Sequence, residues 1–260
     1  MEYDHIKNNS NKLIIIFQSV GQIPAEEFDK ILNGEVSSEQ IKNYHSNYNY
    51  MKIAVKNSSF DYLFIKDYYS QCYGWYIVDS GEFIVNKLNE ELTEFLCNNK
   101  YKYVYAFGSS KGASGALIYG NINKYITHVL ALVPQIEIAK FINGAFGRYK
   151  DLFFNTKVEF EREVDNFLYK IYSIKNIYDK KKIYLYSGMY DNQVQQILKL
   201  YNISIKNGYE MRLLFNRTDE KHTPLVINHL PLLEDILFNL NDDEYVKSKT
   251  FVLTENIFLI

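Results

Sequence analysis

The sequence predicts an α/β fold in which helices cover both faces of a mostly parallel sheet. Two observations predict it: strand-like runs alternate with helix-like runs along the chain, and the strand-like runs are short, apolar and rich in β-branched and aromatic residues. The chain has 260 residues, of which 47% are hydrophobic, which is enough to bury the core of one such domain. We therefore expect residues 1–260 to form a single domain.

The expected elements follow from hydrophobic periodicity and from the turn residues that separate them. Strands are expected at residues 12–17, 52–55, 62–65, 101–107, 128–133, 182–187 and 210–215. Helices are expected at residues 25–32, 84–97, 115–122, 193–207 and 225–240. The second of these helices carries Leu88, Leu92 and Leu96 on a 3.6-residue stripe, which predicts one apolar face turned toward the sheet.

Composition and charge exclude several classes of protein. The formal net charge is −2, so no basic excess is present to displace counterions from a nucleic acid. The two cysteines, Cys72 and Cys97, are too few for a disulfide framework and favour a reducing compartment. The apolar run at residues 13–17 is too short for a signal peptide or a membrane span. We expect a cytoplasmic protein with no membrane span and no nucleic-acid partner.

The most informative motif is Gly-x-Ser-x-Gly at residues 108–112, which follows the strand expected at 101–107. A strand, a sharp turn that carries a serine and a helix that starts with small residues form the layout of a nucleophile elbow. Glycine at both flanking positions avoids Cβ collisions across so tight a turn. Ser110 has glycine two residues before it and two residues after it, which Ser109 lacks, so Ser110 is the expected nucleophile.

A serine nucleophile needs a base, and the base needs a carboxylate that orients it. In one known chain order these residues follow as Ser, then Asp or Glu, then His. Asp191 comes just after the strand expected at 182–187, and His222 lies in the loop after the strand at 210–215. Open α/β sheets build their sites at the carboxyl ends of strands. We therefore expect Asp191 and His222 to complete a triad, with Asp219 and His229 as the alternatives.

The segment between Pro134 and Asp179 carries many phenylalanines among charged residues and shows no strand signal. It is long for an ordinary connection between two core strands. We expect a helical cap insertion at about residues 135–179 that lies over the site and supplies an acceptor pocket. The alternative is an insertion that only packs against the domain.

Further candidates surround the expected serine. An oxyanion hole in such a site combines the backbone N–H of the residue after the nucleophile, here Lys111, with one from a loop after an early strand. Gln18 or Ser19, at the exit of the strand at 12–17, is the expected second donor. Tyr73 and Trp75 lie in an aromatic loop, and we expect them to stack against substrate, although large aromatic side chains more often pack in the core. No metal is expected.

This layout resembles the α/β-hydrolase superfamily over roughly residues 13–240. Three stretches are similar to bacterial capsule-biosynthesis proteins within it, notably the polysialic acid O-acetyltransferases. They are residues 107–112 (Phe-Gly-Ser-Ser-Lys-Gly), 67–69 (Asp-Tyr-Tyr) and 73–76 (Tyr-Gly-Trp-Tyr). The resemblance implies an α/β-hydrolase fold and the O-acetylation of a capsular or surface polysaccharide.

By this resemblance Ser110 is acylated by acetyl-CoA, His222 is the general base, Asp191 orients His222, and a sugar hydroxyl accepts the acetyl group. Two alternatives stay open. A carboxylesterase or deacetylase would use the same triad with water as the acceptor. A non-catalytic accessory protein of a glycan assembly complex would keep the elbow only as architecture. The sequence does not indicate the oligomeric state.

Overall fold

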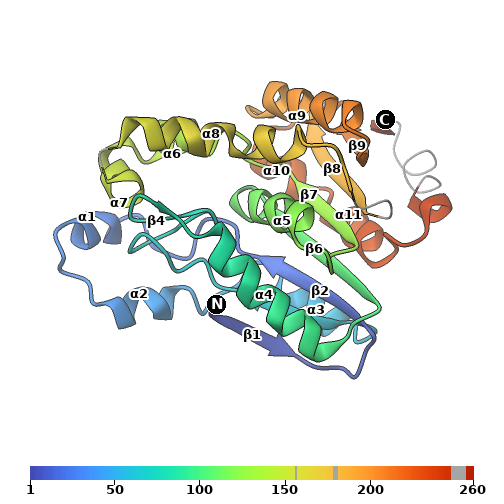
Figure 1. Cartoon of the computed structure of the whole chain (residues 1–260), viewed down its shortest axis with the longest axis horizontal. Helices are drawn as coiled ribbons and strands as arrows, with labels where there is room; N and C mark the ends of the chain where they lie inside the picture. The colour runs from blue at the N-terminus through green and yellow to red at the C-terminus, as the bar shows by residue number, and fades with distance from the viewer. Residues whose placement is uncertain (156, 178–180, 247–255) are drawn as a thin grey trace.

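The structure, a computed structural model, describes residues 1–155, 157–177, 181–246 and 256–260 (Figure 1). The strands in chain order are β1 (Tyr3–Ile6), β2 (Lys12–Phe17), β3 (Asp61–Ile65), β4 (Val78–Asp79), β5 (Glu82–Phe83), β6 (Tyr103–Ser109), β7 (His128–Leu132), β8 (Lys182–Gly188), β9 (Glu210–Asn216) and β10 (Ile257–Leu259).

The helices include a short 3₁₀ turn, η1, which lies between α6 and α7. They are α1 (Glu27–Leu32), α2 (Ser38–Tyr44), α3 (Met51–Lys56), α4 (Val85–Asn99), α5 (Lys111–Ile122), α6 (Ile138–Ala145), η1 (Gly147–Tyr149), α7 (Lys150–Phe154), α8 (Val158–Tyr172), α9 (Val194–Lys206), α10 (His222–Ile227) and α11 (Leu230–Phe238).

In the described part of the chain, eight strands form one sheet in the order β1-β3-β2-β6-β7-β8-β9-β10. The six strands from β3 to β9 in this order run parallel, and β1 and β10 add antiparallel edges. Consecutive parallel strands need crossover connections, and the helices supply them. The expected α/β architecture with a mostly parallel sheet is therefore confirmed.

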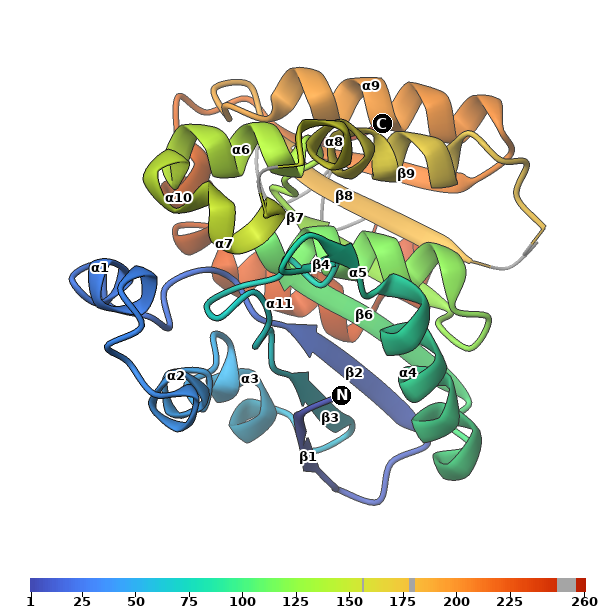
Figure 2. The same ribbon diagram turned by 60° about the vertical axis from the view of Figure 1, so that its left-hand side comes forward.

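Alternation along the central strands sends side chains to both faces of the sheet. In β2, Leu13, Ile15 and Phe17 join the core that α4, α5, α8 and α9 cover, whereas Ile14 and Ile16 join the core that α3, α10 and α11 cover. Figures 1 and 2 show α4 and α5 on one side of the sheet and α11 on the other. Because both faces are buried, these strands are continuous apolar runs without polar alternation.

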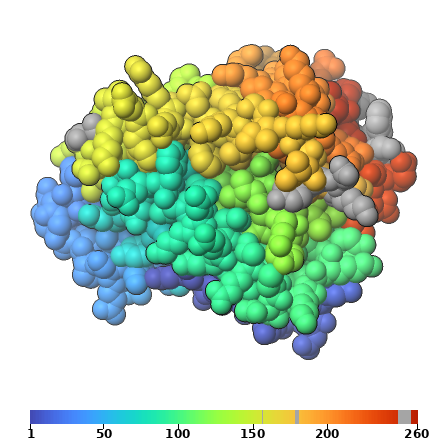
Figure 3. Space-filling view, in the orientation of Figure 1, coloured from blue at the N-terminus to red at the C-terminus, as the bar shows by residue number. Residues whose placement is uncertain are grey.

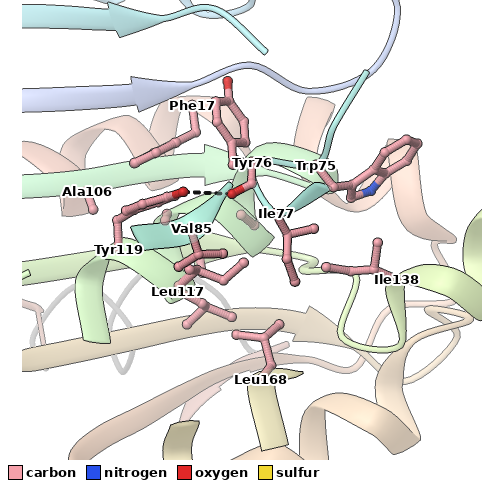
Figure 4. Packing of buried hydrophobic residues seen from close by; sticks show 14 of the residues in the cluster. Phe17, Trp75, Tyr76, Ile77, Val85, Ala106, Leu117, Tyr119, Ile138 and Leu168 are labelled. Atoms are coloured by element: carbon pink, nitrogen blue, oxygen red, sulfur yellow. Dashed lines mark hydrogen bonds between the residues drawn. The ribbon is translucent and has the colours of Figure 1, made fainter. Parts of the chain in front are cut away.

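Helix α5 lies unusually close to its neighbours, which fixes the position of the turn before it. A Cβ atom at Gly115 would lie 2.7 Å from the ring of Tyr76, so only glycine allows this approach. The hydroxyl of Tyr119 donates a hydrogen bond of 2.7 Å to the carbonyl of Tyr76, as Figure 4 shows. Phe17 packs edge-on against Tyr76 and stacks on Tyr119 in the same cluster.

Three expected elements differ from the structure. The helix expected at 115–122 begins earlier, at Lys111, directly after Ser110. Residues 52–55 belong to the helix α3 and not to a strand, because the fold buries the adjacent residues Ile53 and Ala54 and leaves Val55 85% exposed. A strand would have buried alternate residues. The helix expected at 225–240 divides into α10 and α11. Pro231 lies in the first turn of α11, where its missing N–H costs nothing, whereas inside a continuous helix it would break a hydrogen bond.

The insertion between β7 and β8 is helical, with α6, η1, α7 and α8 in its described residues; Asp179 lies outside them. Its helices pack against the core around Trp75, whose ring contacts Phe141, Phe146 and Phe153. In Figure 3 the yellow surface of this insertion lies directly above the teal surface that includes α4.

Candidate active site

Ser110 lies at a sharp turn between β6 and α5. Its backbone has φ 54° and ψ −118°, a conformation that a residue with a side chain rarely adopts and that the surrounding structure must enforce. A Cβ atom at Gly108 would lie 2.4 Å from the backbone of Gly112, and one at Gly112 would lie 2.2 Å from the carbonyl oxygen of Phe17. Both flanking glycines are therefore required by close backbone contacts, as the motif indicates.

The structure brings the three expected triad side chains together. The Nε2 atom of His222 lies 2.9 Å from Oγ of Ser110, and its Nδ1 atom lies 3.1 Å from Oδ1 of Asp191. Asp191 is buried, and its carboxylate also accepts bonds from the Gln193 amide at 3.0 Å and the Ser187 hydroxyl at 3.4 Å. The imidazole, whose side chain is 26% exposed, is thus held between a fixed carboxylate and the serine.

The alternative histidine has a different partner. The Nε2 atom of His229 lies 2.8 Å from Oε2 of Glu220, a carboxylate in the loop before α10, of which His222 is the first residue. His229 is half-buried and lies just before α11. Asp191, rather than Asp219, is the carboxylate within reach of His222.

The backbone amide of Lys111 opens α5, where helical N–H groups have no intrahelical partner and the helix dipole favours negative charge. Its side chain is fully buried, with Nζ 2.5 Å from Oδ2 of Asp67. The ammonium is therefore occupied inside the protein and does not reach a substrate or a cofactor phosphate.

The two residues expected to supply the second oxyanion donor already use their amides. The Gln18 amide donates to the Tyr76 hydroxyl at 2.5 Å, and the Ser19 amide donates to Oδ1 of Asn49 at 3.0 Å. The next amide, that of Val20, has no hydrogen-bond partner within the described ranges, and Val20 lines the cavity beside Ser110. Val20 comes one residue after the two donors expected from the sequence, just past the exit of β2.

The stacking role expected for Tyr73 and Trp75 is not open to them, because both are 0% exposed. The Trp75 indole donates to Oε1 of Gln135 at 2.5 Å, and the Tyr73 hydroxyl accepts from the Ile23 amide at 2.9 Å. Local sequence shows an aromatic loop but not its burial, which depends on the insertion packed over it. Both residues build the core under the site.

A cavity of about 610 Å³ opens beside Ser110 and His222. Its walls are mainly apolar and come from α3, α10 and α11, with Met51, Val226 and Leu230 among them. The insertion supplies no wall of this cavity among its described residues, in contrast to the pocket-forming role expected of it. This size suits a small-molecule substrate.

Three of the residues that line this cavity have a strained backbone. Tyr50 (φ 67°) and Val133 (φ 44°) line it together with Ser110, and all three have positive φ without being glycine. A β-branched residue such as Val133 rarely adopts this conformation. Strain of this kind persists where the fold enforces it and is concentrated at functional sites.

Comparisons with known proteins agree with this architecture. No protein-family model and no curated protein matches the chain. Its structure is similar to the capsule O-acetyltransferase of Neisseria meningitidis serogroup A, with a TM-score of 0.67 at 18% identity over 91% of this chain and 90% of that one. A mutant of that enzyme in complex with CoA gives a TM-score of 0.62 at 16% identity over 92% and 90%. An esterase of Pyrococcus furiosus gives 0.54 at 16% identity, also over 92% and 90%.

The chain has the α/β-hydrolase fold. In this fold the nucleophile stands on the turn after a central strand, and the acid and the base follow later strands. Here the corresponding positions are held by Ser110 after β6, Asp191 after β8 and His222 after β9. Within the described ranges, no cluster of side chains is suited to hold a metal ion, and no helix is long and apolar enough to cross a membrane.

Proposed function

We propose that the protein is a serine acyltransferase that works through an acyl-enzyme at Ser110. The observation that carries the proposal is the continuous arrangement of Asp191, His222 and Ser110, at 3.1 Å and 2.9 Å, on a strained turn that opens into a cavity. A serine with only a structural role needs no imidazole beside its hydroxyl, whereas a serine nucleophile needs a base and a group that orients the base.

In the first half of the reaction, Nε2 of His222 takes the proton of Ser110 while Oγ attacks the acyl carbonyl. The tetrahedral oxyanion accepts hydrogen bonds from the amide of Lys111 and from that of Val20. When the bond to the leaving group breaks, His222 returns the proton to that group. Asp191 keeps the imidazole in the required tautomer and stabilises its charged form.

In the second half, His222 removes a proton from an acceptor hydroxyl, which attacks the acyl carbonyl of the acyl-enzyme. As the ester bond to Ser110 breaks, His222 returns this proton to Oγ of Ser110. We propose acetyl-CoA as the donor and a hydroxyl of a capsular or surface polysaccharide as the acceptor. The structural similarity to a capsule O-acetyltransferase that has been solved with CoA supports this choice. The cavity beside Ser110 is the proposed site for the donor.

An esterase or deacetylase is the second candidate, and the similarity to an archaeal esterase favours it. The two activities share every step except the acceptor, which is water in the esterase. Transfer requires that the acceptor outcompete water at the acyl-enzyme. A non-catalytic accessory role is the third candidate, and it requires an unactivated Ser110.

Reaction with a fluorophosphonate probe tests the proposal, because the probe needs an activated serine and an oxyanion hole. We expect labelling of Ser110 that Ser110→Ala abolishes without unfolding the chain. Intact-mass measurement after incubation with acetyl-CoA should then show an acetyl adduct on the protein. This adduct should disappear faster when polysaccharide is added than in buffer alone. Discharge at equal rates would favour the esterase, and a wild-type protein inert to the probe would favour the accessory role.

A further inference from the structure

A fully buried ion pair lies directly behind the elbow, and the proposed mechanism uses neither of its charges. The Nζ atom of Lys111 lies 2.5 Å from Oδ2 of Asp67, and both side chains are 0% exposed. The ammonium also lies 4.9 Å from the ring centre of Tyr73 and 5.0 Å from that of Tyr76. Burial lowers the pKa of Lys111, and the charge of Asp67 opposes this effect. A buried ion pair is by itself weak evidence for stability, so its role depends on what it holds in place.

On one side, the Asp67 carboxylate organises the turn at residues 74–76. It accepts hydrogen bonds from the amides of Gly74 at 3.2 Å, Trp75 at 3.0 Å and Tyr76 at 3.1 Å. Trp75 and Tyr76 both have positive φ, at 49° and 59°. Two consecutive large residues hold this conformation only where other bonds enforce it. The Asp67 carboxylate therefore fixes the backbone position of Tyr76.

Tyr76 connects this turn to the exit of β2. Its hydroxyl accepts a bond of 2.5 Å from the Gln18 amide and donates one of 2.8 Å to the carbonyl of Ile65. In return, Oε1 of Gln18 accepts a bond of 3.1 Å from the Asp67 amide. The strand exit at residues 18–20 is thus tied to Asp67 by two routes.

On the other side, the ion pair holds Lys111, whose amide is one proposed oxyanion donor. The other proposed donor, the amide of Val20, comes from a different element of the fold. The ladder between β2 and β6, which pairs Phe17 with Gly108, joins the two elements, and so do the contacts of the Ser19 hydroxyl with Ser109, but neither amide takes part in these contacts. Asp67 is bonded to both halves, directly to Lys111 and through Gln18 and Tyr76 to the turn that carries Val20.

We propose that Lys111 and Asp67 are positioning residues that hold the two halves of the oxyanion hole in register. The proposal rests on the proposed function, since it assigns a role only if an oxyanion forms at Ser110. A misplacement of about 1 Å can cost roughly 10²-fold in rate. Losing one donor outright costs roughly 10²–10³-fold in kcat. Disturbing the pair should therefore lower kcat without weakening substrate binding.

Single substitutions leave a buried charge without its partner and risk unfolding, so the test uses a neutral pair. The double variant Lys111→Met with Asp67→Asn removes both charges and keeps an acceptor oxygen for the turn. Tyr76→Phe breaks only the bond to the Gln18 amide and the bond to Ile65. The control is Lys182→Met with Asp243→Asn, which removes a partly exposed ion pair of 2.9 Å at the end of the sheet away from Ser110. Asp243 also contacts Arg212 and Tyr184, so this control disturbs more contacts than one ion pair.

For each variant we would measure the thermal midpoint, kcat and KM with p-nitrophenyl acetate, and the Ki of a boronic acid that forms a tetrahedral adduct with Ser110. We expect kcat to fall roughly 10–100-fold and Ki to rise by a similar factor in both test variants, with KM within about threefold. The control should leave all three constants unchanged.

A merely structural pair would lower the thermal midpoint and leave kcat and Ki within about threefold in the folded variants. That result would overturn the inference, and if the double variant does not fold, Tyr76→Phe decides by the same criterion. A wild-type protein that reacts with neither ester nor probe would overturn the proposed function and this inference with it. An active wild type with unaffected variants overturns this inference alone.

Discussion

The Nε2 atom of His222 lies 2.9 Å from Oγ of Ser110, although 112 residues separate them in the chain. They meet because Ser110 follows β6 and His222 follows β9, and parallel strands end at the same edge of the sheet. Asp191 follows β8, the neighbour of β9, and reaches the other nitrogen of the same ring. The site is thus assembled by strand order and not by any one loop.

The arrangement of these three side chains predicts that substitutions of them lower kcat by different factors. We expect His222→Ala to lower kcat about as far as Ser110→Ala, on the order of 10⁶-fold, because members of a triad act as a unit. Asp191→Asn should cost less, on the order of 10⁴-fold, since the carboxylate orients the ring without taking the proton. Rates of esterase turnover and of probe labelling would check the order. Equal residual rates in all three variants would contradict the assigned roles.

The close backbone contact at Gly112 predicts that adding one methyl group there lowers both stability and activity. In Gly112→Ala the new Cβ would lie 2.2 Å from the carbonyl oxygen of Phe17, so the end of β2 must move. We expect the free energy of unfolding to fall by about 1–3 kcal/mol and kcat to fall with it. Gly144→Ala, in α6 with open space around it, is the control and should gain up to about 1 kcal/mol. Urea unfolding and ester hydrolysis measure both effects.

The cavity predicts that substitutions on one face of α3 change substrate binding, whereas substitutions on the opposite face do not. Met51 lines the cavity, whereas Val55, on the same helix α3, is 85% exposed and does not line it. Met51→Trp should fill part of the cavity and raise KM for acetyl-CoA about tenfold or more, while Val55→Trp should leave KM unchanged. Steady-state kinetics would decide, and equal KM values for the two variants would place the donor elsewhere.

A buried histidine far from Ser110 predicts a pH effect on stability. Burial lowers the pKa of His128 to about 4, and the nearby charge of Lys182 adds to this effect while that of Asp243 opposes it. Between pH 6.5 and about 4 the unfolded chain therefore binds a proton that the folded chain does not. This histidine stabilises the fold less as pH falls through that window, by up to about 1.4 kcal/mol per pH unit.

His128→Phe removes the titrating group and keeps an aromatic ring beside Tyr105. We expect its free energy of unfolding to depend less steeply on pH than that of the wild type between pH 6.5 and 4. Denaturant unfolding at several pH values measures both slopes. Identical slopes would show that His128 is protonated equally in both states.

Many of the strands and turns could be predicted from the sequence, because they depend on residues that are close together in the chain. The apolar run at residues 12–17 coincides with β2, and the glycines that flank Ser110 mark a turn that no other residue fits. The sequence places Asp191 and His222 near Ser110 because the carboxyl ends of parallel strands meet at one edge of the sheet. Periodicity and turn residues carry this information within a few residues of each position.

Only the tertiary structure decided which side chains face the cavity and which face the core. Trp75 is covered by Phe141 and Phe153 of the insertion, and Lys111 is paired with Asp67 across 44 residues of chain. A local pattern cannot distinguish an aromatic platform from a buried ring, or a free ammonium from a paired one. That distinction depends on which distant segments pack together, and the order of strands in the sheet sets this packing.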